Sequence, residues 1–188
     1  MLKRWAALTD TPEKAGARVS AVLSASGLPY IRDVVVPDQI GGYTEIPHLL
    51  LTPDGILVLE SQYFTGIVHS SAFTKNWTRF EGDQRHVFGN PLHRQRELAD
   101  TLDKMIQGER VGVGVETRFV ITGPVRFAKE IPGGILSEAQ LQSFLATRAR
   151  QIPARQRAVW EVLLSRVACE PVAPFGTRGE VSVHPQSA

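Results

Sequence analysis

The stretch TEIPHLLLTPDGILVLESQ, residues 44–62, decides how this chain folds. Pro53 and Gly55 predict a tight turn, because proline presets φ and glycine tolerates the positive φ that closes the turn. The apolar run 56–59 has no polar alternation, which is typical of a central strand covered on both faces. We therefore predict a buried β-hairpin at the centre of the fold.

A simple hairpin also predicts which side chains face one another. The expected pairs are Leu51 with Ile56, Leu49 with Val58, Pro47 with Glu60, and Glu45 with Gln62. Side chains alternate along a strand, so the last two pairs should share one face of the sheet. A carboxylate such as Glu60 is costly to bury there unless it is paired, hydrogen-bonded or bound to a metal. This end of the hairpin is therefore the candidate site.

The hairpin resembles that of the nuclease-related domain (NERD) family, which has an apolar run, a Pro-x-Gly turn and a Glu-x-Lys motif. The residues kept in order and at matching spacing are Ile46, His48, Pro53, Gly55, Ile56, Val58, Glu60 and Gly66. Further along, Trp77 and the helix start Asn90-Pro91 also match the order of the family. The resemblance covers about residues 12–167.

This resemblance implies a restriction-endonuclease-like fold of the α/β (α+β) class, with a mixed central sheet and flanking helices. We expect one domain over residues 1–169, because a chain of this length can bury a sizeable core. Residues 170–188 contain three prolines and two glycines but few large apolar residues, so we expect a flexible tail.

Local signals predict the other elements. We expect helices starting at Thr11-Pro12, Asn90-Pro91, Ser137 and Pro153, strands over 30–36, 66–69 and 117–122, an outer hairpin of 77–80 with 85–88, and a loop over 37–42. The helix that starts at Thr11 should end at Gly27.

Composition limits the class of protein. The chain is 43% hydrophobic and 21% charged, as in soluble globular proteins. Its single cysteine, Cys169, excludes an intramolecular disulfide and a cysteine-rich zinc site and fits a reducing cytoplasm. We expect a cytoplasmic protein without a membrane span. The formal charge of +2 is too small for general nucleic-acid binding, so DNA contact requires a local patch.

The resemblance implies that, in NERD-like nucleases, carboxylates from the hairpin and from a helix hold one or two divalent cations. A lysine then orients or activates the attacking water. Carried across, the helix glutamate falls on Ala17, the hairpin aspartate on Pro47, the glutamate on Glu60 and the lysine on Gln62. A glutamine four residues after the family's asparagine falls on Arg94, with Gln95 adjacent.

Only Glu60 remains of the charged site residues. One carboxylate leaves a cation mostly bound to water, and the uncharged Gln62 cannot act as a base. We therefore predict a catalytically inactive NERD-like pseudonuclease that needs no cofactor. It would act as an accessory module for DNA or for a protein of a nucleic-acid-processing system.

The alternative is an active DNA endonuclease that depends on Mg or Mn. Glu45 lies two residues before Pro47, and Glu13 lies one helical turn before Ala17. Together with Glu60 they form a displaced set of three carboxylates. A simpler interpretation makes Glu13 a first-turn acid favoured by the helix dipole and Glu45 a solvated residue at a strand end.

Two basic stretches are candidate nucleic-acid contacts. The residues Arg148, Arg150, Arg155 and Arg157 cross a helix–helix junction with few acidic neighbours. Basic residues also lie near the outer hairpin and include Arg85, Arg94 and Arg96. They are mixed with acidic residues, which indicates a solvated surface at least as strongly as a DNA contact. His48 should face away from Glu60 and have a structural role.

Overall fold

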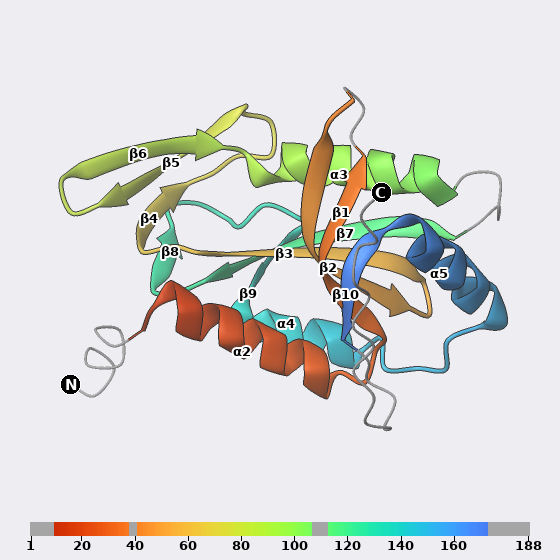
Figure 1. Ribbon diagram of the computed structural model, residues 1–188. Coiled ribbons are helices and arrows are strands. Elements are labelled where there is room, and N and C mark those ends of the chain that lie inside the picture. The colour runs from red at the N-terminus through yellow and green to blue at the C-terminus, as the bar shows by residue number, and fades with distance from the viewer. Residues whose placement is uncertain (1–9, 38–40, 107–112, 173–188) are drawn as a thin grey trace.

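The computed structural model describes residues 10–37, 41–106 and 113–172, which form helices packed around two sheets (Figure 1). The larger sheet has the strand order β10-β1-β2-β3-β7-β9, and the smaller sheet has the order β6-β5-β4-β8. Both sheets contain parallel and antiparallel pairs. The predicted mixed α/β fold is confirmed.

The elements follow one another in this order: α2 (Pro12–Ala25), β1 (Tyr30–Pro37), β2 (Tyr43–Thr52), β3 (Gly55–Tyr63), β4 (Gly66–His69), β5 (Asn76–Glu81), β6 (Gln84–Gly89), α3 (Pro91–Ile106), β7 (Gly114–Thr122), β8 (Val125–Phe127), β9 (Ile135–Ser137), α4 (Glu138–Ala146), α5 (Ala154–Arg166) and β10 (Ala168–Val172). No helix in these described ranges is long and apolar enough to cross a bilayer.

The central hairpin forms as predicted near its turn. Leu51 pairs with Ile56 and Leu49 pairs with Val58. Within the turn, the Thr52 hydroxyl donates to the Gly55 carbonyl oxygen at 2.9 Å, which holds the two strand ends together. The apolar run of β3 is completely buried, as expected for a central strand.

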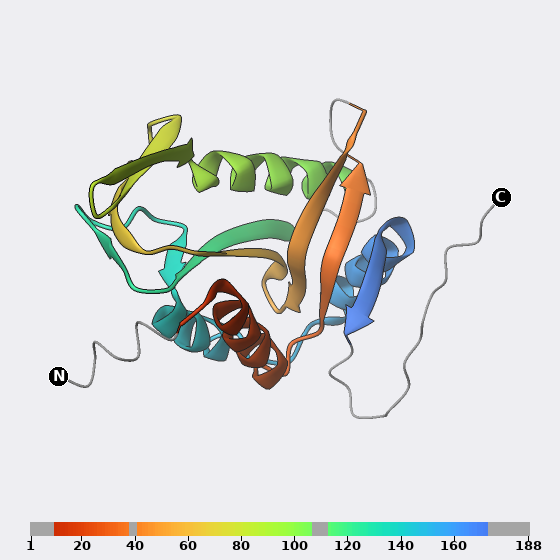
Figure 2. The ribbon, with the colours of Figure 1, turned by 60° about the vertical axis from the view of Figure 1, so that its left-hand side comes forward.

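The two outer pairs of the predicted hairpin are wrong, because the β2–β3 ladder ends at His48 and Leu59. Beyond this point β2 stays paired with β1, and the two strands rise away from β3 (Figure 2). The bend coincides with Asp33 in β1, whose φ of 52° is unusual for a residue with a side chain. Ile46 and Leu49 lie three residues apart yet share one core cluster, so the strict alternation assumed from sequence is broken between them.

The larger sheet is covered on both faces. The α3 face, on which Ile56 and Val58 lie, packs against α3 and α5. The α2 face, on which Leu57 and Leu59 lie, packs against α2 and α4. Figure 1 shows α2 and α3 on opposite sides of β3. The helix that a residue belongs to therefore decides which side of the sheet it can reach.

The smaller sheet packs one face against a third core cluster, which includes Val68 and Trp77. Its connection to β3 passes through Gly66, where φ is 82°. A Cβ atom at this position would lie 2.0 Å from the Phe80 carbonyl oxygen, so only glycine fits. This close approach explains the glycine of the sequence pattern.

Three short strands differ from the sequence prediction. The strands β8 and β9 were not predicted, and the expected tail is wrong for Glu170, Pro171 and Val172, which pair with β1. The edge of β1 supplies hydrogen-bond partners that composition alone does not reveal. Residues 173–188 of the predicted tail and residues 38–40 of the predicted loop lie outside the described residues. The single domain over residues 1–169 stays a prediction.

Candidate functional site

A buried acid and an arginine meet where β2 and β3 separate. Glu60 follows the apolar run of β3 and is only 6% exposed. Arg94, in the first turns of α3, donates from Nε to Glu60 Oε1 at 2.7 Å. The Arg94 side chain is half exposed, so the ion pair lies at the border between core and solvent. The acid that the sequence places at the site is therefore paired with a cation from its own chain.

The same guanidinium group also reaches β2. Arg94 Nη2 donates to the main-chain oxygen of Glu45 at 2.9 Å. The last ladder pair of the hairpin joins His48 to Leu59, so Arg94 bridges the two strands just beyond the end of their pairing. One side chain thus connects β2 and β3 where no hairpin hydrogen bond does.

The start of α3 is fixed by Asn90. Its Oδ1 accepts a hydrogen bond from Leu92 N at 3.0 Å and caps the helix, as predicted. Its Nδ2 donates to Ser71 O at 3.1 Å and Thr74 O at 2.7 Å, which anchors the helix to the loop before β5. Because the cap is buried and bonded on both sides, the direction of Arg94 one turn later is set by the fold.

Half of the Glu60 carboxylate is left without a partner. Its Oε2 atom is buried and has no hydrogen bond to any residue that the structure describes. A buried charged oxygen normally requires more than one donor, because the interior offers no water to replace the lost solvation. The pairing with Arg94 is therefore the main compensation for burying this acid, and its loss would leave the charge uncompensated.

The other predicted site residues lie apart from this pair. The Glu45 and Gln62 side chains are exposed, and Glu45 contributes only its main-chain oxygen to the Arg94 contact. Glu13 is exposed on α2, which covers the opposite face of the sheet, and the pKa of its carboxyl is lowered chiefly by the Thr11 side chain. The structure therefore does not bring Glu13 to Glu60.

No group of three histidine, cysteine or acidic side chains in the described part of the chain is arranged to hold a metal ion.

Residues 13–122 match the family model of the nuclease-related domain. This chain belongs to the NERD family. The match covers more than half of the chain and contains both Glu60 and Arg94, so the pair lies within the family domain.

An uncharacterized protein of Bacillus anthracis is 23% identical to this NERD chain over 95 residues, which is 50% of this chain and 45% of that protein. The NERD chain thus spans less than half the length of this curated relative. No solved structure matches this NERD chain.

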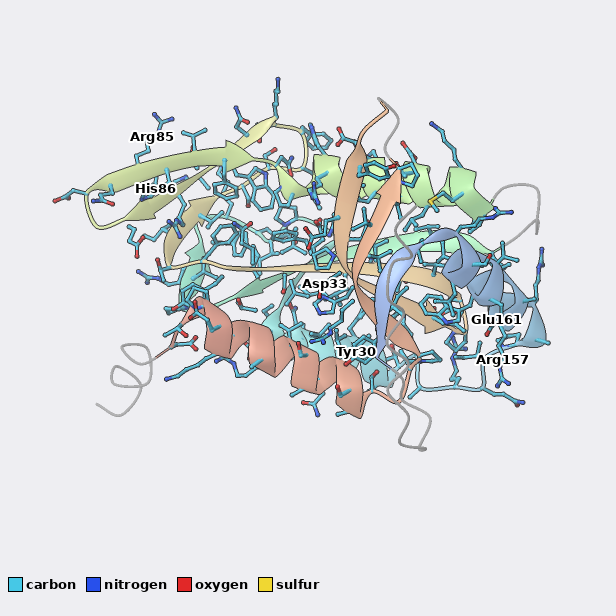
Figure 3. The ribbon with its side chains drawn as sticks, in the orientation of Figure 1. Tyr30, Asp33, Arg85, His86, Arg157 and Glu161 are labelled. Carbon is cyan, nitrogen blue, oxygen red and sulfur yellow. The ribbon has the colours of Figure 1, made fainter. Side chains whose placement is uncertain are left out.

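Two arginines of the second basic stretch of this NERD chain are held in ion pairs. Arg148 donates to both carboxylate oxygens of Glu116 at 3.0 Å and stacks 3.7 Å from the Phe144 ring centroid. Arg150 lies 3.0 Å from Asp54. The remaining two, Arg155 and Arg157, are exposed on α5 and form no ion pair with any described residue. Figure 3 labels Arg157 on this helix. Their role in nucleic-acid contact stays a prediction.

His48 lies in the NERD hairpin at the last ladder pair, opposite Leu59. Burial lowers the pKa of its imidazole, an effect only partly opposed by a hydrogen bond with the Leu59 main chain and by the charge of Asp33. Its Nδ1 atom is buried without a hydrogen-bond partner in the described part of the chain. These features fit the structural role that the sequence predicts for this histidine.

The lowered pKa of His48 predicts a pH-dependent stability. Above the unfolded pKa the imidazole is neutral in both states, so it has no effect. As the pH falls below that value, the unfolded chain binds the proton first, and folding stability decreases until the folded pKa is reached. Urea unfolding between about pH 8 and about pH 5 should show a smaller decrease for His48→Gln than for the wild type. If the exposed control His69→Gln reduces the loss of stability between these pH values as much as His48→Gln does, the pH dependence is not due to His48.

Proposed function

We propose that this NERD domain is a pseudonuclease in which the guanidinium of Arg94 takes the place of a cation beside Glu60. The observation that carries the proposal is the 2.7 Å hydrogen bond from Arg94 Nε to Glu60 Oε1. A carboxylate with a guanidinium at this distance already has its positive partner. A divalent ion approaching the same oxygen would meet like charge at close range.

The ligand set also supports this proposal. Magnesium requires nearly octahedral oxygen coordination and calcium requires six to eight oxygens, whereas Glu60 is the only buried carboxylate among the described residues. The residues present therefore do not fit a catalytic cation held in fixed geometry. Without it, no metal-bound hydroxide forms and no metal stabilises charge on a phosphate.

The positions around Glu60 supply no replacement for the metal. Gln62 is uncharged and exposed, so it neither activates water nor stabilises charge as a lysine would. Pro47 contributes no side-chain ligand and no main-chain donor. The domain then retains a nuclease fold for contact rather than for cleavage, as an accessory module for nucleic acid or for a protein partner in its processing.

A plasmid-nicking assay tests the proposal. Supercoiled DNA incubated with Mg²⁺ or Mn²⁺ should remain as intact with the wild-type protein as with Glu60→Ala. Cleavage by the wild type that Glu60→Ala removes would overturn the proposal. Residual nicking of equal size in both samples would indicate a contaminating nuclease and leave the chain inactive, as proposed.

The alternative endonuclease uses Glu13, Glu45 and Glu60 with Mg or Mn. One observation favours it, namely the buried and unpaired Oε2 atom of Glu60, which is a free ligand oxygen. This mechanism requires Arg94 to leave the acid. It predicts that Glu45→Ala and Glu60→Ala each abolish cleavage and that Glu13→Ala weakens it, so the same assay separates the two functions.

A further inference from the structure

The smaller sheet has an outward face that no described element covers. The Phe80 face, as we define it, consists of Ile67 and His69 on β4, Thr78 and Phe80 on β5, Arg85 and Val87 on β6, and Arg126 on β8. Residues between these positions, such as Val68 and Trp77, point into the third core cluster. The alternation of exposed and buried positions therefore separates an inner and an outer side.

Strand pairing places four of these residues in one row across the sheet. Ile67 pairs with Arg126 on one side and with Phe80 on the other, and Phe80 pairs with Arg85. The row is therefore arginine, isoleucine, phenylalanine, arginine. Neighbouring strands lie about 4.8 Å apart, and the two arginines flank an apolar strip that is two strands wide, β4 and β5.

The face is unusually apolar for an exposed surface. Phe80 and Ile67 are each 37% exposed and Val87 is 54% exposed. They are three of the seven large hydrophobic side chains that are exposed in the described residues. The His69 ring lies 5.3 Å from the Phe80 ring at an angle of 72°. Two adjacent aromatic rings, packed edge to face, thus lie on the exposed side of the sheet.

The charge of the face is positive. None of its seven positions is acidic, whereas Arg85 and Arg126 carry positive charge. The nearby Glu81 lies one residue after Phe80 and so on the inner side, where it pairs with Arg79 at 3.5 Å and with the Thr65 hydroxyl. Glu81 is therefore not on the Phe80 face. Figure 3 shows Arg85 on the outer hairpin, far from Arg157 of α5.

We propose that the Phe80 face binds single-stranded nucleic acid. Bases would stack on Phe80 and His69 while Arg85 and Arg126 contact phosphates, which is the combination of aromatic platform and positive charge that holds single strands with little sequence preference. A duplex keeps its bases stacked internally and offers no free ring to Phe80. The inference deepens the proposed function, because it names the ligand of the accessory module.

Fluorescence anisotropy with a labelled single-stranded oligonucleotide of about 12 nucleotides tests this binding. Phe80→Ala should weaken binding about tenfold, the loss of one stacked base. The double variant Arg85→Glu/Arg126→Glu should weaken it further and reduce the slope of log affinity against log salt by roughly 1.4, for two lost phosphate contacts. All three residues are exposed, and circular dichroism checks that the variants fold.

The matched control is Lys14→Glu/Lys104→Glu, which changes the net charge equally at two exposed lysines of α2 and α3. It should leave the affinity within about twofold of the wild type. The proposal is overturned if no oligonucleotide binds at low salt, if duplex DNA binds as tightly as the single strand, if Phe80→Ala has no effect, or if the lysine control weakens binding as much as the double arginine variant of the Phe80 face. Cleavage of the oligonucleotide would contradict the pseudonuclease proposal alone.

Discussion

Replacing Arg94 with methionine is expected to lower the free energy of unfolding by about 2 kcal/mol, since the buried Glu60 carboxylate then loses its partner. Breaking a fully buried ion pair costs about 3–5 kcal/mol, and the half-exposed Arg94 side chain places this pair below that range. Methionine keeps much of the length of arginine, so the change reports the charge and hydrogen bonds rather than lost volume. Urea denaturation at neutral pH measures it.

Two further variants make this result specific. Arg96→Met, at an exposed position of the same helix, should change the stability by no more than about 0.5 kcal/mol. The double variant Glu60→Gln/Arg94→Met should be more stable than Arg94→Met alone, because no buried charge remains. An Arg94→Met variant as stable as Arg96→Met would show that the ion pair does not support Glu60.

The second large effect is a gain of cation binding. A chain with Pro47→Asp, Gln62→Lys and Arg94→Gln regains the residue types that the NERD resemblance places at these positions. We expect its melting temperature to rise by about 5–10 °C in Mn²⁺ at about 100 times the dissociation constant. The physical reason is that a second carboxylate is added one residue beyond the last β2–β3 ladder pair, on the strand that Arg94 connects to Glu60, while the competing guanidinium is removed.

The control for this gain keeps the arginine. Pro47→Asp/Gln62→Lys with Arg94 intact should show no Mn²⁺-dependent change in melting temperature beyond that of the wild type. If this double variant binds Mn²⁺ as tightly as the triple variant, Arg94 is not what excludes the cation. Differential scanning calorimetry with and without the ion measures all three chains.

Local chemistry explains why much of the fold was predictable. Thr11 caps α2 through its side chain, and Ser137 and Gln140 form the reciprocal bonds of a capping box at α4. Each of these signals depends on residues close in the chain. The strand β10 was missed because its pairing with β1 joins residues far apart in sequence, and a proline within it suggested a tail.

The candidate site was only partly predictable for a related reason. Glu60 was identified because it ends an apolar strand, but the hairpin register was extended too far, since nothing in the sequence marks the bend at Asp33. Arg94 was assigned to nucleic-acid contact, because spacing from Asn90 gives its place on the helix and not its partner. A lone buried acid that lacks the expected lysine was the signal for a compensating cation.

The same limit applies to the basic stretches. Arg148 and Arg150 find their acids in Glu116 and Asp54, which are distant in the chain. Conversely, the sequence places Arg85 among acids, whereas the alternation of β5 and β6 places it on the side of the sheet opposite Glu81. Charge in sequence becomes charge on a surface only when the pairing of strands is known.

Electron paramagnetic resonance of Mn²⁺ tests most directly whether Arg94 stands where a cation would bind. The wild-type protein and Glu60→Gln are each titrated into Mn²⁺. The signal of the free hydrated ion should have the same intensity in both titrations. The contradicting result is a loss of the free-ion signal with the wild type but not with Glu60→Gln. It would place a bound metal at Glu60, although the account holds that this carboxylate is already paired with Arg94.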